Sequence, residues 1–249
     1  MMNRKRIKIL LALFTLLLLG KFAYKYAPWR IEFLGFYEKV WAHRVDSIDK
    51  LESALSHFKG VEVDLVFQEA SQTLDVGHPP VPSIGLTFEN YLKAIPNGEE
   101  VFIWMDIKNL TVENAPAILK RISLLLEERN YPKSLLLIES QQPESLQIFS
   151  KDGFFVSYYL PYGLGEMDTF SLQKEVENIH TVLANNKSLG VSSSYLDYEV
   201  MSLHFPNTTK YLWKIDGVTP KNFFQTRKIL KDSTVKVVLT HFRSLKGNR

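Results

Sequence analysis

The chain has 249 residues, of which 45% are hydrophobic, enough for one large core. Its formal charge of +3 originates at the amino end: seven of the 30 Lys and Arg residues lie within positions 1–30, which hold no acid, so the other 23 face 27 Asp and Glu residues. A mildly acidic body argues against nucleic-acid binding, which requires a basic face. The absence of cysteine excludes disulfides, thiolate metal sites and cysteine nucleophiles.

The amino end has the layout of a secretory signal or an uncleaved signal anchor, with a basic start and an apolar run over residues 9–19. Extended to residues 7–26, with its lysines snorkelling, the run is long enough to span a membrane. Small residues at the −3 and −1 positions of a cleavage site are hard to find near Ala23 or Ala27, so we favour an anchor. The leading basic flank predicts a cytoplasmic amino end and a body on the outer, periplasmic or extracellular, face of the cytoplasmic membrane. Cleavage would instead give a secreted protein.

Short apolar or β-branched runs alternate with helical segments through residues 31–249. The predicted strands are 39–44, 60–67, 101–108, 134–140, 153–161, 189–196, 209–217 and 235–242. The predicted helices are 47–58, 87–95, 114–130, 142–152, 172–186, 198–205 and 220–232, and the first two begin at the N-caps Ser47 and Thr87. Eight alternating units favour an α/β fold, a (βα)8 TIM barrel that follows an N-terminal hydrophobic helix. An open doubly wound sheet is the alternative, although no glycine-rich nucleotide-binding motif follows a strand.

A polar, proline-bearing excursion over residues 67–86 interrupts this regular pattern. Long loops inside compact domains tend to be functional. This one follows the carboxyl end of a strand, which is where barrel enzymes place their chemistry.

Charged and titratable side chains fall at or near the carboxyl ends of the first three predicted strands and in the excursion. They are His43, Arg44, Glu62, Asp64, His78, Asp106 and Lys108. Three carboxylates make a hard oxygen site suited to Mg²⁺ or Ca²⁺. Two histidines beside such a site can serve as acid and base, and an arginine with a lysine can hold an anionic group such as phosphate. Residues at strand ends could join them: Trp213 and His241 as substrate contacts, and Glu139 and Asp216 as substrate contacts or helix caps.

The order H-R, E-x-D, His and D-I-K resembles the pattern of the glycerophosphodiester phosphodiesterase family. WAHRVDSIDKLESAL, GVEVDLVF and the GHPP turn are closest to the menorin-like branch of the same phospholipase C-like phosphodiesterase superfamily. The resemblance implies a TIM-barrel phosphodiesterase that hydrolyses glycerophosphodiesters or (lyso)phospholipid head groups with a divalent cation. It implies Glu62, Asp64 and Asp106 as metal ligands, His43 and His78 as the catalytic pair, and Arg44 and Lys108 as phosphate contacts.

The chain departs from the family pattern at three positions. Val45 replaces a glycine and could narrow the approach to the phosphate, Asp106 replaces a glutamate, and Pro79 follows His78 where an aspartate could orient the imidazole. These departures permit a second hypothesis, a non-catalytic membrane-anchored barrel that acts as a ligand-binding or scaffold module. A sugar-processing barrel is disfavoured, because two carboxylates at i and i+2 on one strand lie too close together to flank a glycosidic bond.

Overall fold

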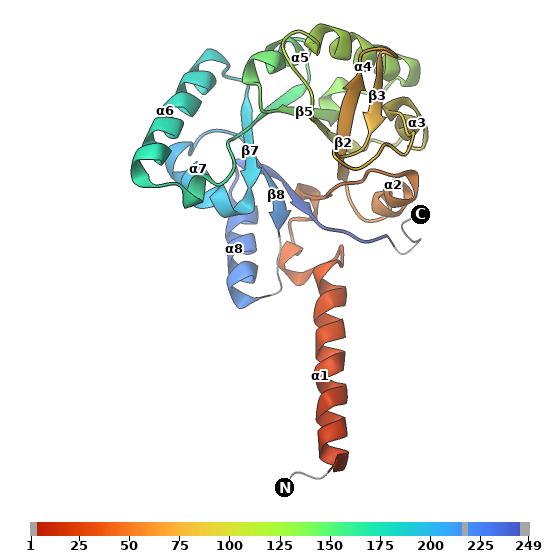
Figure 1. The fold of residues 1–249 in the computed structure, drawn as a ribbon, viewed down its shortest axis with the longest axis vertical. Coiled ribbons are helices and arrows are strands. Elements are labelled where there is room, and N and C mark those ends of the chain that lie inside the picture. Colours follow the sequence, from red (N-terminus) through yellow and green to blue (C-terminus); the bar gives the residue numbers. More distant parts are fainter. Residues whose placement is uncertain (1–3, 216–218, 245–249) are drawn as a thin grey trace.

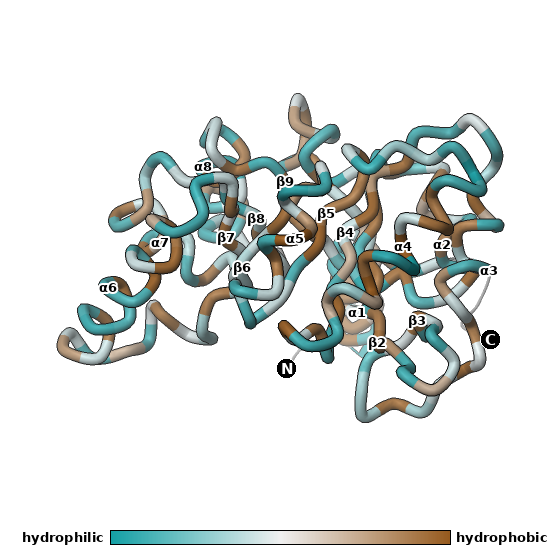
Figure 2. The backbone as a smooth tube through the Cα atoms, turned by 90° about the horizontal axis from the view of Figure 1, so that it is seen from above, coloured by the Kyte–Doolittle hydropathy of each residue, from teal (hydrophilic) through white to brown (hydrophobic). Residues whose placement is uncertain are grey.

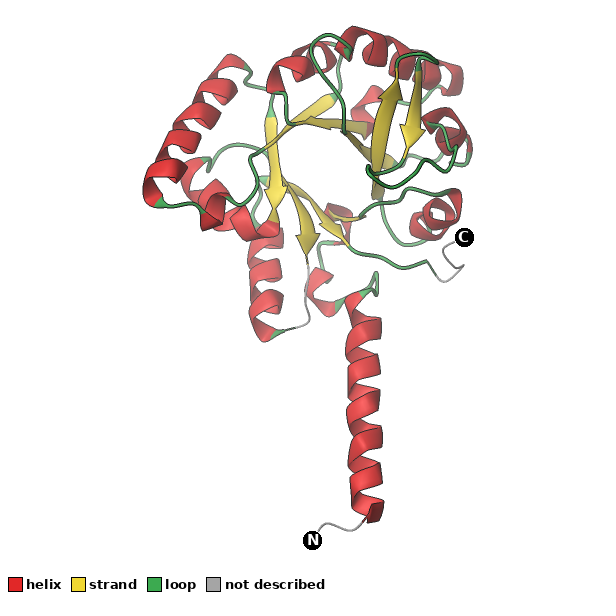
Figure 3. Cartoon of the chain, viewed as in Figure 1, coloured by secondary structure: helices red, strands yellow, loops and turns green. Residues whose placement is uncertain are grey.

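The computed structural model describes residues 4–215 and 219–244 and contains a closed barrel of eight parallel strands (Figure 1; Figure 3). The strands are β1 (Val40–Ala42), β2 (Gly60–Gln68), β4 (Phe102–Ile107), β5 (Leu136–Ser140), β6 (Phe155–Tyr159), β7 (Gly190–Ser194), β8 (Lys210–Ile215) and β9 (Val235–Thr240). Closure comes from β1, which pairs in parallel with both β2 and β9. The predicted TIM barrel and all eight of its strands are confirmed.

One further strand, β3 (Thr73–Val76), lies in the excursion and pairs antiparallel with β2. This strand was not predicted, because four residues in a polar, proline-bearing stretch give too short a pattern to distinguish from a loop. The hairpin carries the chain away from the barrel rim and back to it, and the segment that holds His78 follows it.

Helices alternate with the strands and cover the outside of the barrel (Figure 1). They are α2 (Ile48–Leu55), α3 (Phe88–Lys93), α4 (Ala115–Arg129), α5 (Gln147–Lys151), α6 (Thr169–Asn185), α7 (Tyr198–His204) and α8 (Pro220–Lys231). The predicted N-caps are confirmed: Ser47 accepts a hydrogen bond from the backbone N–H of Lys50, and Thr87 accepts one from that of Asn90. Hydrophobic residues are concentrated toward the strands at the centre (Figure 2).

Most of the barrel strands are buried on both faces, so the barrel has an outer and an inner core. The outer core packs between the strands and the helices. The inner core is a smaller cluster of Trp41, Trp104, Leu137, Tyr211, Val237 and Leu239. Two glycines make room for its rings: a Cβ added at Gly60 would lie 2.4 Å from Trp41, and one added at Gly190 would lie 2.6 Å from Tyr211.

The amino-terminal helix α1 (Arg4–Lys25) projects from the body and is exposed along most of its length (Figure 1). Its segment Arg6–Lys25 is long and apolar enough to cross a membrane. The chain then passes through residues 26–36, which we term the collar, before it enters β1. The domain boundary predicted between residues 30 and 31 falls inside the collar and stays a prediction.

Candidate active site

All nine residues predicted for the site line one cavity of about 370 Å³. Side chains alternate along a strand, so positions two apart in β2 and in β4 both point into the barrel. The lower inward positions carry the apolar inner core, and the upper ones, toward the carboxyl ends, carry the charged groups. This alternation explains why Glu62 and Asp64 lie on one face of an otherwise apolar strand.

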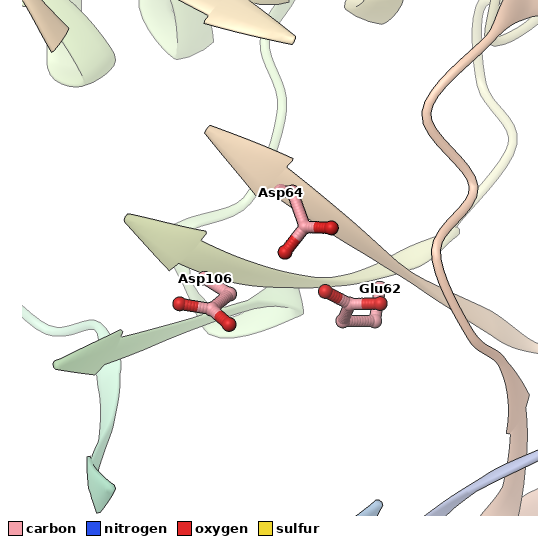
Figure 4. A group of neighbouring side chains, drawn as sticks. All are labelled: Glu62, Asp64 and Asp106. Atoms are coloured by element: carbon pink, nitrogen blue, oxygen red, sulfur yellow. The ribbon is translucent and has the colours of Figure 1, made fainter. Parts of the chain in front are cut away.

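Three carboxylates converge in the cavity from two neighbouring strands (Figure 4). Asp64 of β2 is in register with Asp106 of β4, and Glu62 lies one inward position below Asp64. One oxygen from each of the three lies within 4.8 Å of the others. Burial, with the neighbouring acidic groups as a smaller cause, raises the pKa of Glu62 well above its usual value. Burial likewise raises the pKa of Asp106, against the opposing effect of Lys108.

The Lys108 ammonium balances part of this negative charge. It lies 2.6 Å from Asp64 Oδ1 and also forms an ion pair with Asp106. Burial alone would lower the pKa of Lys108, but its two carboxylate partners outweigh burial and raise it.

The donor set fits a divalent cation. Asp64 Oδ2 is buried and has no hydrogen-bond partner among the described residues, and Arg44 Nε lies 3.9 Å from it. An orphaned carboxylate oxygen beside two further acids offers the hard oxygen ligands that Mg²⁺ and Ca²⁺ prefer. The three predicted ligands could therefore hold such an ion.

His43 lies against this acidic group, at the end of β1. Its Nε2 is 3.7 Å from Glu62 Oε2, and its buried Nδ1 has no hydrogen-bond partner within the described part of the chain. Burial, reinforced by the His241 ring centred 5.0 Å away, lowers the pKa of His43 well below its usual value. The imidazole is therefore neutral at neutral pH.

Arg44 is held in an unusual backbone conformation, with φ of 53°. Its backbone N–H donates to Glu62 Oε2 at 2.6 Å, which compensates for the left-handed conformation. Lys50 donates from α2 to the carbonyls of His43 and Arg44 and so fixes the loop. Val45 is fully buried in the outer core and does not line the cavity, so the expectation that it narrows the approach to the phosphate is wrong.

His78 reaches the cavity from the excursion. Its Nε2 lies 3.1 Å from Arg44 Nη2, and its Nδ1 lies 2.7 Å from the carbonyl of Pro79. A guanidinium only donates and a carbonyl only accepts, so Nε2 accepts and Nδ1 carries the proton. Pro79 does not offer the side-chain partner that an aspartate would, but its backbone carbonyl orients the imidazole instead.

Two further acidic residues, Asp46 and Glu139, form hydrogen bonds at the site, and neither is among the nine residues predicted for it. Asp46 accepts from the backbone N–H of Asp64 at 3.0 Å, and burial followed by the Asp64 charge raises its pKa to about 7.

Glu139 of β5 lines the cavity and accepts from Trp104 Nε1 at 2.7 Å and from the Ser192 hydroxyl. Burial is the first cause that raises the pKa of Glu139 to about 8. Asp46 was not singled out although it lies inside the quoted stretch WAHRVDSIDKLESAL, and the strand-end position of Glu139 was also a usable signal.

An aromatic wall bounds the cavity on the side of β6 and β8. Tyr159 meets the predicted Trp213 edge to face, with ring centroids 5.9 Å apart, and Tyr162 stacks on Trp213 at 6.1 Å. The two tyrosines were not predicted. Asp216 lies outside the described residues.

The fold and the cavity together define a TIM barrel with an acidic, histidine-flanked site at the carboxyl ends of its strands. No protein-family model and no curated protein matches the chain. A candidate glycerophosphodiester phosphodiesterase from Galdieria sulphuraria is similar in structure, with 15% identity, 81% of this chain and 93% of that chain covered, and a TM-score of 0.57.

Two further solved structures share the fold. A glycerophosphodiester phosphodiesterase from Parabacteroides distasonis is 14% identical, with 84% of this chain and 95% of that chain covered and a TM-score of 0.53. A phosphodiesterase from Oleispira antarctica, in complex with the product sn-glycerol-3-phosphate, is 13% identical, with 84% and 94% covered and a TM-score of 0.54. The predicted resemblance to glycerophosphodiester phosphodiesterases is confirmed for the fold, and the menorin-like branch stays a prediction.

Proposed function

We propose that the chain is a divalent-cation-dependent phosphodiesterase that hydrolyses glycerophosphodiesters or (lyso)phospholipid head groups. The observation that carries this proposal is the convergence, in one cavity, of the acidic cluster Glu62, Asp64 and Asp106 with three imidazoles and two cationic side chains. The neighbouring structures support it, because they share the barrel and are described as phosphodiesterases, one of them with a glycerol phosphate product.

Glu62, Asp64 and Asp106 are the proposed ligands of the cation, Mg²⁺ or Ca²⁺. Bound there, it would polarise a phosphoryl oxygen and offset the charge of the diester. Arg44 and Lys108 would contact the remaining phosphate oxygens, since both line the cavity beside the acids. Trp213 and Tyr159 would pack against the organic part of the substrate, with His241 beside His43 at the rim.

His43 and His78 would move the protons. One imidazole takes a proton from the attacking water or from a neighbouring substrate hydroxyl as the new oxygen–phosphorus bond forms. The other delivers a proton to the alkoxide as its bond to phosphorus breaks. The tautomer of His78, with Nδ1–H fixed on the Pro79 carbonyl, leaves Nε2 directed at Arg44 and the cavity.

For location, α1 is the proposed signal anchor, with the barrel on the outer face of the cytoplasmic membrane. The length and composition of α1 support a membrane span, and the basic residues at the start of α1 support the orientation. Removal of the leader would instead give a secreted protein.

A second candidate function is a non-catalytic ligand-binding barrel. It is favoured by the position of Lys108, whose ammonium contacts Asp64 and Asp106 and so compensates the acidic group without a metal ion.

Hydrolysis by the full chain in detergent separates the two functions. Bis(p-nitrophenyl) phosphate and a panel of glycerophosphodiesters would be tested with Mg²⁺, Ca²⁺ or a chelator. We expect chelator-sensitive turnover that is lost in Glu62→Gln and His43→Ala but kept in Glu144→Gln and His204→Ala, which change residues outside the cavity. A folded protein with no turnover under any metal would leave the binding barrel as the better description.

A further inference from the structure

The junction between α1 and the barrel is built from specific contacts. The Tyr24 hydroxyl, in the last turn of α1, donates to Glu32 Oε2 of the collar at 2.7 Å and accepts from the backbone N–H of Ile31 at 2.8 Å. Glu32 also accepts from Arg30 Nε at 2.7 Å, and Arg30, Glu32 and Phe33 are all buried. The last turn of the helix is thus hydrogen-bonded to the segment that packs on the barrel.

Two elements of the barrel hold this junction from either side. On α8, Arg227 donates to the collar carbonyls of Glu32 and Leu34 and lies 4.7 Å from the Phe36 ring. After β9, the Arg243 guanidinium lies 4.4 Å from the ring of Tyr26 and 4.9 Å from that of Phe22. These contacts set the direction in which α1 leaves the body.

Large apolar side chains surround the junction but face outward. Trp29, Ile31 and Leu34 of the collar and Phe224 of α8 are 64%, 63%, 62% and 70% exposed. Phe224 precedes Arg227 by one helical turn, so it belongs to the part of α8 that adjoins the collar. We call these four residues the apolar rim.

The rim lies at the level where α1 meets the body. Figure 1 shows that the collar and the first turn of α8 extend farthest along α1 toward its amino end. The apolar span ends at Lys25. Two exposed lysines lie close to this level in the chain: Lys21 near the end of α1 and Lys221 in the first turn of α8. Aromatic residues with flanking lysines are typical of the boundary between hydrocarbon and lipid head groups.

We propose that the apolar rim docks the barrel on the surface of the bilayer that α1 spans, with its basic neighbours against anionic lipid phosphates. The docking also positions the cavity. His241 lines the cavity and is two residues from Arg243, so their Cα atoms are at most about 7 Å apart. Because Arg243 contacts the last turns of α1, the cavity is held beside the lipid head groups. This inference rests on membrane insertion of α1, and it does not require turnover.

Single-cysteine spin labelling tests the docking, since the chain has no cysteine of its own. Full-length Ile31→Cys, Leu34→Cys and Phe224→Cys would be labelled in nanodiscs that contain anionic lipid, and collisions with oxygen and with a water-soluble nickel complex would be measured. Leu16→Cys in α1 reports membrane insertion. Phe170→Cys and Leu124→Cys are matched controls, because both are exposed apolar residues on helices distant from α1 (Figure 1).

We expect the rim labels to show a severalfold higher ratio of oxygen to nickel collisions than the two controls. Rim labels as accessible to nickel as the controls, with the Leu16 label in lipid, would overturn the docking but leave the anchor intact. A Leu16 label in water would overturn both. Dipolar broadening at the rim that disappears on dilution with unlabelled protein would mean that a second copy covers it, which also contradicts the proposal.

A second measurement avoids the introduced cysteines. Brominated lipids quench tryptophan emission at the membrane boundary, and Trp41 and Trp104 are buried inside the barrel. Quenching should be weaker in Trp29→Phe than in the unmodified chain, and it should be the same in Leu124→Ala as in the unmodified chain. Equal quenching of all three proteins would contradict contact between Trp29 and lipid.

Discussion

The Lys108 ammonium lies 2.6 Å from Asp64 Oδ1, and it bridges that carboxylate to Asp106 on the neighbouring strand. Asp64 is 1% exposed on its side chain and Lys108 is 22% exposed, so the pair is largely shielded from water. In such surroundings an unpaired charge is costly, which makes the lysine a structural counter-ion as well as a proposed phosphate contact.

Replacement of Lys108 by methionine should therefore destabilise the cation-free protein by about 3 kcal/mol, because it leaves buried carboxylates uncompensated. Added Mg²⁺ or Ca²⁺ should raise the melting temperature of Lys108→Met more than that of the wild type. Thermal melting with cation and with chelator measures both effects. The control is Lys93→Met, which breaks an exposed ion pair with Glu89 and should cost no more than about 1 kcal/mol. An equal response of Lys108→Met and the wild type to the cation would argue against a metal site.

Cation affinity should rise with pH. The pKa values of Glu62 and Asp106 are raised without a metal, and a cation binds the deprotonated carboxylates, so protons compete with it. Isothermal titration calorimetry of Mg²⁺ or Ca²⁺ binding in buffers of different ionisation enthalpy should show proton release. Affinity that does not change across the acidic to neutral range would contradict the proposed ligands.

The raised pKa of Glu139 predicts that the stability of the protein depends on pH. Its pKa is raised from 4.5 to about 8, so between these values the folded state holds this proton more tightly than the unfolded state does. The free energy of unfolding therefore decreases as pH rises through this window. Glu139→Gln keeps an acceptor for Trp104 and removes the ionisation, so in chelator its melting temperature should fall less between about pH 5 and pH 8. The exposed Glu144→Gln should follow the wild type, and the same slope for all three proteins would show that Glu139 is not the group responsible.

The close packing of Gly60 against Trp41 in the inner core predicts a compensating pair of substitutions. Gly60→Ala would place a Cβ 2.4 Å from the Trp41 ring and should destabilise the protein by about 1–3 kcal/mol through overpacking. In the background of Trp41→Leu the same substitution should cost clearly less, because the ring is gone. Chemical denaturation of the four proteins of this double-mutant cycle measures the difference, and strictly additive effects would refute the steric explanation.

The strands and the metal-ligand candidates were predictable because both depend on local alternation. A strand that is buried on both faces reads as a continuous apolar run, so Glu62 and Asp64 were conspicuous in β2. Tyr162 was not predictable, because it reaches the site from a loop whose course is set by packing. Asp46 lies inside a quoted stretch, but its role depends on a hydrogen bond from the backbone of Asp64, which a side-chain pattern does not record. The contact between His78 and Pro79 was unforeseen for a related reason: the side chain of Pro79 offers no partner to His78, but its carbonyl does, and sequence motifs record side chains rather than the direction of a carbonyl.

The hydrogen bond from His78 to the Pro79 carbonyl has an evolutionary consequence. Where an aspartate side chain orients an imidazole, substitution of that aspartate removes the hydrogen bond that fixes the tautomer. A backbone carbonyl is present whichever amino acid occupies the position. Position 79 is thus released from supplying an acid and can vary as the turn requires. A departure from the resembled motif at this position is therefore weak evidence against the proposed activity.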